Sequence, residues 1–254
     1  MEKSIAMSGL LTAFILLSFL AGFNARAQTI NDSDNDGVND FDEVNIYRTD
    51  PLKNDTDGDG FLDKEELITG YSPHNLKKVK LEDNDYDNDG LSDRMELNFH
   101  TDLSNPDTDG DGHKDGGEIK YGYDPLNPGV DAKLKKRIEI NAGKEQTLYY
   151  YLGVVRLGKF KVSTGKPGMP TPKGTFAINN KIPKAWSKSY GLWMPYWLGM
   201  GKFGIHELPV WPNGYREGAD HIGKAVSHGC IRLGIGEAKK LYDWAEVGTE
   251  VYIY

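Results

Sequence analysis

The chain has 254 residues, a formal net charge of −8 and one cysteine, Cys230, which excludes a disulfide within the chain. The charge is unevenly divided: residues 28–131 contain 28 acidic and 9 basic side chains, whereas residues 132–254 contain 9 acidic and 19 basic ones. A single well-mixed domain seldom shows this pattern, so two modules are predicted, with a boundary near the turn-forming run 127–129.

Residues 1–27 have the pattern of a secretory signal peptide. Lys3 precedes an apolar run at 9–23, and Ala25 and Ala27 form a small-x-small cleavage site. The alternative, an uncleaved anchor, needs about 20 apolar residues, and this run is shorter and contains polar side chains. We therefore expect cleavage and export to the periplasm, the cell wall or the extracellular space, with no membrane-spanning segment after cleavage.

Residues 28–131 contain four copies of the pattern Asp-x-Asp-x-Asp-Gly-x-x-Asp-x-x-Glu, at 32–43, 55–66, 85–96 and 107–118. Calcium takes six to eight oxygen ligands, which such a loop supplies from positions 1, 3, 5, 7, 9 and 12. Position 7 contributes its carbonyl, position 9 often holds a water, and position 12 is a bidentate Glu. One such loop alone could be a solvated acidic turn, but four favour structural calcium. The predicted ligands are Asp32, Asp34, Asp36, Val38, Asp40, Glu43, Asp55, Asp57, Asp59, Phe61, Asp63, Glu66, Asp85, Asp87, Asp89, Leu91, Asp93, Glu96, Asp107, Asp109, Asp111, His113, Asp115 and Glu118.

A helix is predicted after each acidic loop, for example at 41–47 and 62–68, but not before it. With the connectors 49–52 (TDPL) and 123–128 (YDPLNP), residues 32–128 resemble the bacterial thrombospondin type 3 repeat family. The resemblance implies a rigid, calcium-ordered stalk or adhesive spacer without catalytic function. Since this half has few large apolar residues, we expect it to depend on the metal for order.

Residues 132–254 predict a mainly β domain, a sandwich or barrel. Short β-branched and aromatic runs separated by glycine predict strands at 137–140, 147–152, 154–157, 160–162 and 174–179. A helix at 236–245 and a closing strand at 250–254 complete the pattern.

Cys230 lies in the run Ser227-His228-Gly229-Cys230-Ile231-Arg232, which favours a thiol nucleophile over a buried thiol acting as a small hydrophobe. A thiol with its usual pKa needs a base. His228 would share a strand face with Cys230, and His206 closes another apolar run. The residues alone rank His206 and His228 nearly equal as that base.

Three ordered motifs, 162–176 (VSTGKPGMPTPKGTF), 204–206 (GIH) and 222–233 (IGKAVSHGCIRL), resemble the L,D-transpeptidase catalytic domain of the YkuD type. The resemblance covers nearly all of 136–254 and implies that family's β-sandwich or barrel fold. It also implies that Cys230 is the nucleophile and His206 the general base, that His228 tunes or orients the thiol, and that no cofactor serves catalysis. Ser227 and Gly229 would shape the turn.

The same resemblance implies that Arg232 holds a substrate carboxylate and that the Gly229 and Cys230 amides form an oxyanion hole. The aromatic segment 182–200, with Tyr190 and Trp193 as substrate-binding candidates, is either a groove wall or core. Glu207 stands where the family usually has glycine, and 211–221 is a longer insertion. The third member of the catalytic triad stays open.

The function implied is an exported L,D-transpeptidase of peptidoglycan biosynthesis, which serves cell wall biogenesis and cell shape. It would form an acyl-enzyme on Cys230 and transfer the stem peptide to an amine. The alternatives are an L,D-carboxypeptidase, or a calcium-stiffened wall-binding protein with an inactive catalytic fold. Expected partners are peptidoglycan stem peptides and carbapenem-type inhibitors, and no nucleic acid.

Overall fold

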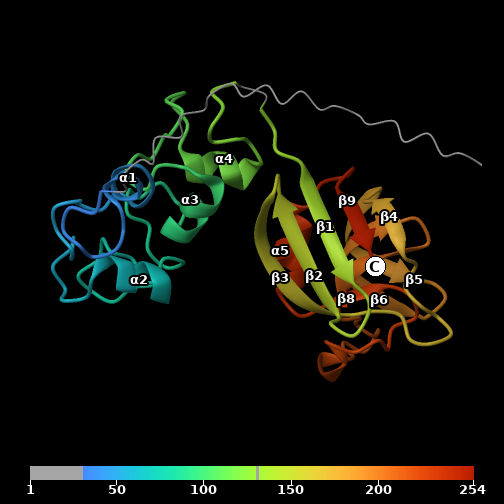
Figure 1. The fold of residues 1–254 in the computed structure, drawn as a ribbon. Coiled ribbons are helices and arrows are strands. Elements are labelled where there is room, and N and C mark those ends of the chain that lie inside the picture. Colours follow the sequence, from blue (N-terminus) through green and yellow to red (C-terminus); the bar gives the residue numbers. More distant parts are fainter. Residues whose placement is uncertain (1–30, 130–131) are drawn as a thin grey trace, which may run out of the picture.

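A computed structural model describes residues 31–129 and 132–254, shown as a ribbon in Figure 1. The predicted signal peptide lies outside the described residues. Within residues 31–129 and 132–254, no helix is both long and apolar enough to cross a membrane. The acidic repeats carry the short helices, and the segment after them carries the sheet.

Each acidic loop leads directly into a short helix, as the sequence predicts. The helices are α1 (Asp40–Asp42), continued by the π-helical turn η1 (Glu43–Tyr47), α2 (Asp63–Thr69), α3 (Asp93–Phe99) and α4 (Asp115–Tyr121). Each helical segment begins at the ninth position of its loop. It is followed by a residue in the left-handed backbone conformation, which ends the helix. The region is therefore a series of loop-helix units.

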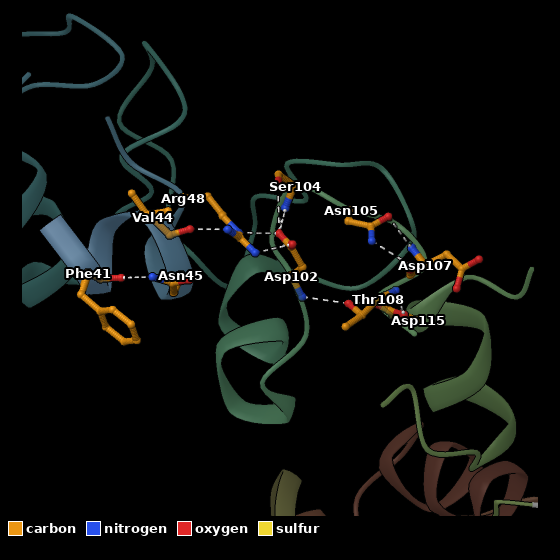
Figure 2. A network of polar contacts seen from close by, with 10 residues as sticks. All are labelled: Phe41, Val44, Asn45, Arg48, Asp102, Ser104, Asn105, Asp107, Thr108 and Asp115. Atoms are coloured by element: carbon orange, nitrogen blue, oxygen red, sulfur yellow. Dashed lines mark hydrogen bonds and ion pairs between the residues drawn. The ribbon is translucent and has the colours of Figure 1, made fainter. Parts of the chain in front are cut away.

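The repeats contact one another across long sequence separations, and the stalk or adhesive spacer that the resemblance implies stays a prediction. Figure 2 shows Arg48, at the end of η1, donating from Nε to Asp102 Oδ1 at 2.7 Å across 54 positions of sequence. Neighbouring loops also pair, since the amide of Gly116 donates to Asp89 at 2.7 Å and that of Lys64 to Asp36 at 3.3 Å. The first and third repeats are therefore in direct contact.

The second half is mainly β, as predicted, and its nine strands form one sheet in the order β4-β9-β1-β2-β3-β8-β7-β6-β5. Eight pairings between neighbouring strands make up this order, and two of them, β1·β9 and β7·β8, are parallel. The strands are β1 (Lys136–Asn141), β2 (Thr147–Leu152), β3 (Val155–Ser163), β4 (Gly174–Ala177), β5 (Asn180–Ser187), β6 (Leu192–Met200), β7 (Phe203–Glu207), β8 (Ile231–Leu233) and β9 (Glu250–Ile253).

Two of the predicted strands, 154–157 and 160–162, are one continuous strand, β3. The predicted break between these strands at Gly158 is wrong. Gly158 pairs with Tyr150 of β2, and a Cβ at this position would lie 2.8 Å from the Tyr150 ring. The glycine is required by packing and not by a turn.

The main core lies between the sheet and helix α5 (Glu237–Trp244), seen behind β2 and β3 in Figure 1. Alternate residues of β1, Ile138 and Ile140, are fully buried, as strand periodicity requires. Leu241 of α5 and Ala245, the residue that follows this helix, belong to the same buried cluster. This core holds the central strands β8 and β7 in place, and these carry the candidate site.

A second apolar cluster joins the repeats to the sheet. Leu91, Phe99 and Ile119 come from the third and fourth repeats, and Leu152 comes from the end of β2. Leu152 is fully buried although its strand ends there. Burying a leucine side chain stabilises by about 1.5–3 kcal/mol, so the two halves stabilise each other where they meet.

We expect Leu152→Ala to lower the free energy of unfolding by about 2–5 kcal/mol, because it opens a cavity in this cluster. All five tryptophans lie in 132–254, so tryptophan fluorescence during denaturant unfolding follows this half of the chain. Val154→Ala, two residues away at a side chain 93% exposed, is the matched control and should change little. Equal stability of the two variants would show that the halves do not pack together in solution.

Candidate active site

The residues predicted to act together do lie around one cleft. Its volume is about 410 Å³, and His206, His228, Cys230 and Arg232 all line it. β7 and β8 run parallel with His206 paired to Arg232, and Cys230 immediately precedes β8. Two strands far apart in sequence thus bring the imidazole, the thiol and the guanidinium to one surface. The remaining lining residues are Ser187, Ser189, Tyr190, Leu192, Met194, Trp197, Lys202, Phe203, Pro209, Trp211 and Glu217.

His206 is buried and its ring is held from both sides. Nδ1 lies 2.6 Å from the backbone carbonyl of Glu207, and Trp197 stacks on the ring with centroids 5.9 Å apart. A carbonyl only accepts, so Nδ1 carries the proton and Nε2 is left free to accept one. The group that orients His206 is therefore the Glu207 backbone, which the sequence left undecided.

Both titratable partners favour their neutral forms. Burial lowers the pKa of His206 to about 4, and the nearby Arg232 adds to this while the Glu207 carbonyl opposes it. Burial also raises the pKa of the Cys230 thiol, against smaller opposing effects of the Gly204 backbone and Arg232. At neutral pH the cleft therefore holds a thiol and a neutral imidazole, not an ion pair.

The turn before β8 is shaped by Ser227 and Gly229, as the resemblance implies. Ser227 Oγ donates to the carbonyl of Cys230 at 2.5 Å and accepts from the amide of Gly229 at 3.2 Å. Gly229 has φ 109°, in the left-handed region that favours glycine. The Gly229 amide is therefore bound to Ser227 in this structure, and its role in an oxyanion hole stays a prediction.

His228 lies at the rim of the cleft. Its ring is exposed and stacks on Tyr190 with centroids 4.8 Å apart, and Lys166 Nζ lies 3.2 Å from Nε2. Burial, then the charges of Lys166 and Arg232, lower the pKa of His228. Of the two histidines that the sequence ranked together, only His206 has a ring nitrogen fixed by a carbonyl.

Of the two aromatic candidates, Tyr190 lines the cleft and Trp193 does not. Leu192 and Met194 of β6 face the cleft, so Trp193 between them points to the other side of the strand. There its ring packs on Trp186 with centroids 4.7 Å apart. The structure therefore places Trp193 outside the cleft, on the other side of β6.

The insertion is tied to the sheet by ion pairs that the sequence analysis missed. Glu207, with a side chain 4% exposed, pairs with Arg216 and accepts from the amide of Gly236 at 3.1 Å. Glu217 lies 3.4 Å from Arg232 and accepts from Trp211 Nε1 at 3.1 Å. The sequence spacing of the two residues in each ion pair matches neither the period of a helix nor that of a strand, so no sequence pattern predicts these pairs.

The acidic loops gather carboxylates that could hold a metal ion. In each loop the aspartates at positions 1, 3 and 5 offer oxygens within 4.8 Å of one another. Both carboxylate oxygens of Glu66 and of Glu96, at position 12, are buried without a hydrogen-bond partner. Burial, with Asp87 and Asp89 nearby, raises the pKa of Glu96 to about 9. Such groups fit a divalent cation, which would supply the missing partner.

The aspartates at position 9 make hydrogen bonds within their own loops. Asp63 accepts from the amide and hydroxyl of Thr56 at 2.8 and 2.7 Å, and Asp115 accepts likewise from Thr108 at 2.9 and 2.6 Å. These carboxylates clamp the start of the loop onto its helix. The corresponding clamps involve Asp40 with Ser33 and Asp93 with the amide of Tyr86.

Comparison with known proteins confirms both resemblances. Residues 135–253 match the family described as L,D-transpeptidase catalytic domain, and 32–54, 55–70, 85–102 and 107–128 match the bacterial TSP3 repeat. A Bacillus subtilis protein named "Putative L,D-transpeptidase YciB" is 31% identical over 125 residues, 46% of this chain and 64% of that protein. A Bacillus licheniformis protein named "Putative L,D-transpeptidase YkuD" is 33% identical over 96 residues, 37% of this chain and 51% of that protein.

Solved structures give partial matches of the same kind. An L,D-transpeptidase from Mycobacterium smegmatis is 23% identical with a TM-score of 0.42, over 48% of this chain and 59% of that one. An L,D-transpeptidase from Stackebrandtia nassauensis is 30% identical with a TM-score of 0.40, over 48% and 57%. The chain thus spans between half and two thirds of the length of each of these relatives.

We expect Arg216→Ala to lower the free energy of unfolding by about 3 kcal/mol, because it leaves the Glu207 carboxylate buried without its cation. Thermal unfolding measures the effect. Asp220→Ala removes a charge from the same insertion at a side chain 82% exposed and is the control. A loss no larger than that of the control would mean that the Glu207–Arg216 pair does not hold the insertion.

Proposed function

We propose that this chain, whose residues 135–253 match the L,D-transpeptidase catalytic domain, is an exported cysteine L,D-transpeptidase that acts on peptidoglycan stem peptides. The observation that carries the proposal is the cleft in which Cys230 and the oriented imidazole of His206 meet. The basic character of 132–254 suits a carboxylate-rich wall polymer.

The proposed reaction begins with the neutral pair. As Cys230 Sγ attacks the carbonyl that joins residue three of the donor stem to its D-residue, the thiol proton passes to His206 Nε2. The tetrahedral intermediate then expels the D-residue, whose amine takes that proton, and a thioester remains on Cys230. The Glu207 carbonyl keeps the proton on His206 Nδ1 throughout the reaction, so that Nε2 is the nitrogen that accepts and then donates the transferred proton.

The second half of the cycle uses the same groups. An amine of an acceptor stem attacks the thioester and gives its proton to His206 Nε2, and the thiol leaves as Cys230 recovers that proton. The product is a 3→3 cross-link. Water in place of the amine would make the enzyme an L,D-carboxypeptidase, and mass spectrometry of the products from a stem tetrapeptide distinguishes the two reactions.

We further propose that the four acidic loops bind structural calcium. The side chains at positions 1, 3 and 5, together with the position 12 glutamates, would hold the ions, since these are the groups with close or unpartnered oxygens. The ions would offset the mutual repulsion of the carboxylates. Because Leu91 and Phe99 pack on Leu152, an ordered third repeat also covers one end of the catalytic sheet.

Cys230→Ala should abolish formation of an acyl-enzyme with a stem tetrapeptide or a carbapenem, measured by intact-protein mass spectrometry. His206→Ala should slow acylation by about 10²- to 10⁴-fold, because the thiol loses its general base. His228→Ala tests the competing assignment and should have the smaller effect, with His100→Ala in the repeats as a control. If His228→Ala were the crippling change, His206 would not be the base.

Titration calorimetry should find up to four calcium ions per chain, and chelation should lower the thermal stability. Glu66→Gln should remove one ion, because it withdraws a buried ligand carboxylate, whereas the adjacent exposed Glu65→Gln should remove none. A stoichiometry below two for the unaltered chain, or equal stoichiometry for the two variants, would contradict calcium binding in these loops.

A further inference from the structure

The outer face of the sheet, on the side away from the core, carries a row of tyrosines. Ile138 and Ile140 of β1 point to the core, so the residue between them, Glu139, points outward. Strand register places Glu139 between Tyr252 of β9 and Tyr149 of β2. Helix α5 packs on the opposite face, behind β2 and β3 in Figure 1. The two tyrosines therefore lie on the outer face, two strands apart.

The aromatic rings of this row are exposed and held in a set orientation. Tyr252 is 44% exposed, and Tyr254, the next outward residue of the chain, is 38% exposed. Their rings stack with centroids 5.4 Å apart and an angle of 28° between the planes. At the other end of the row, the Arg156 guanidinium lies 5.6 Å from the centre of the Tyr149 ring. Neither Tyr252 nor Tyr254 belongs to the apolar clusters of the described residues, so core packing does not account for them.

The same face has an excess of positive charge. Arg156 and Lys159 of β3 pair in register with Tyr151 and Tyr149 of β2 and so lie on this face. Within residues 31–129 and 132–254, neither cation has an ion-pair partner. The acidic side chains of these strands are each paired with a basic neighbour, in the ion pairs Arg137–Glu139 at 3.2 Å and Lys135–Glu250 at 2.9 Å. The unpaired charge of the face is therefore positive.

A chain of sugars fits this face better than a phosphate polymer does. A pyranose ring has an apolar C–H face that stacks on tyrosine, and its hydroxyls hydrogen-bond to neighbouring polar side chains. Tyr252 and Tyr149 are two strand spacings apart, about 10 Å, which is comparable with the length of a disaccharide unit. A phosphate polymer would bind the cations but would leave the exposed rings of Tyr252 and Tyr254 without a role.

We propose that the outer tyrosine face, formed by Tyr149, Tyr252 and Tyr254, binds the glycan chain of a wall polysaccharide. Sugar rings stack on the tyrosines, and Arg156 and Lys159 bind carboxylates attached to the chain. The described residues that line the cleft lie within 187–232, outside β9, β1, β2 and β3, so the face holds the polymer without occupying the cleft. The inference extends the proposed function but does not rest on it, because binding to this face needs no thioester.

The test is titration calorimetry of the calcium-loaded full chain with chitohexaose, a neutral oligomer of N-acetylglucosamine. Tyr252→Ala and Tyr254→Ala should each weaken binding by about 2- to 10-fold, because each removes one ring from the stack. Tyr121→Ala, at a tyrosine 64% exposed in α4, is the matched control and should bind as the unaltered chain does. Tyr252→Leu keeps an apolar side chain in the strand, so it separates loss of the ring from loss of folding, and it should bind as weakly as Tyr252→Ala.

The role of the cations is measured with glycan strands freed of their stem peptides, whose lactyl carboxylates are then charged. Lys159→Gln should weaken binding of these strands by roughly 2- to 5-fold at low salt, as an exposed charge pair contributes. It should leave the binding of chitohexaose unchanged, because that probe has no charge.

The inference would be wrong if chitohexaose did not bind the unaltered chain, or if it bound Tyr252→Ala and Tyr254→Ala as tightly as it binds the control. It would also be wrong if Lys159→Gln weakened the binding of glycan strands and of polyphosphate alike while the tyrosine changes had no effect, since the face would then be a general polyanion site. Neither sugar probe carries a peptide or forms a thioester, so these results are independent of whether the chain catalyses transpeptidation.

Discussion

The parallel pairing of β7 with β8 is the constraint on which the candidate site depends. It sets His206 beside Arg232 and leaves Cys230 at the start of the neighbouring strand, although the two segments are separated by the whole insertion. Both strands lie at the centre of the sheet, between β3 and β6, and their apolar residues Ile205 and Ile231 are buried. A rearrangement of the site would therefore require a rearrangement of the core.

Burial in this position determines the chemistry of the site. Desolvation favours the neutral forms of the imidazole and the thiol, so in the proposed reaction the thiol proton passes to the imidazole during attack. The buried charges that remain, Glu207 and Arg232, each face a partner from the insertion. The insertion is thus part of the electrostatic balance of the cleft, and its Glu217 is an acidic residue of the cleft wall.

The acidic repeats bear on this site through packing. Their helices α3 and α4 place Phe99 and Ile119 against Leu152 at the end of β2, in the same strand that carries Tyr150 of the main core. Metal binding that orders the third and fourth loops would therefore stabilise the sheet. The contact of Arg48 with Asp102 extends this coupling to the first repeat.

The sequence by itself determined the local features: the four acidic loops, the helix after each loop, most of the strands, and the thiol, imidazole and guanidinium of the cleft. The loops, helices and strands follow from short-range spacing, because a loop, a strand face or a turn such as that of Gly229 depends only on nearby residues. The thiol, imidazole and guanidinium were identified through the resemblance of three motifs to a known family. Three features were decided by the tertiary structure: that Gly158 makes room for Tyr150 within one strand, that Trp193 points away from the cleft, and that Glu207 and Glu217 pair with Arg216 and Arg232. Each depends on which distant segment packs against the residue, and a contact between distant segments leaves no period in the sequence.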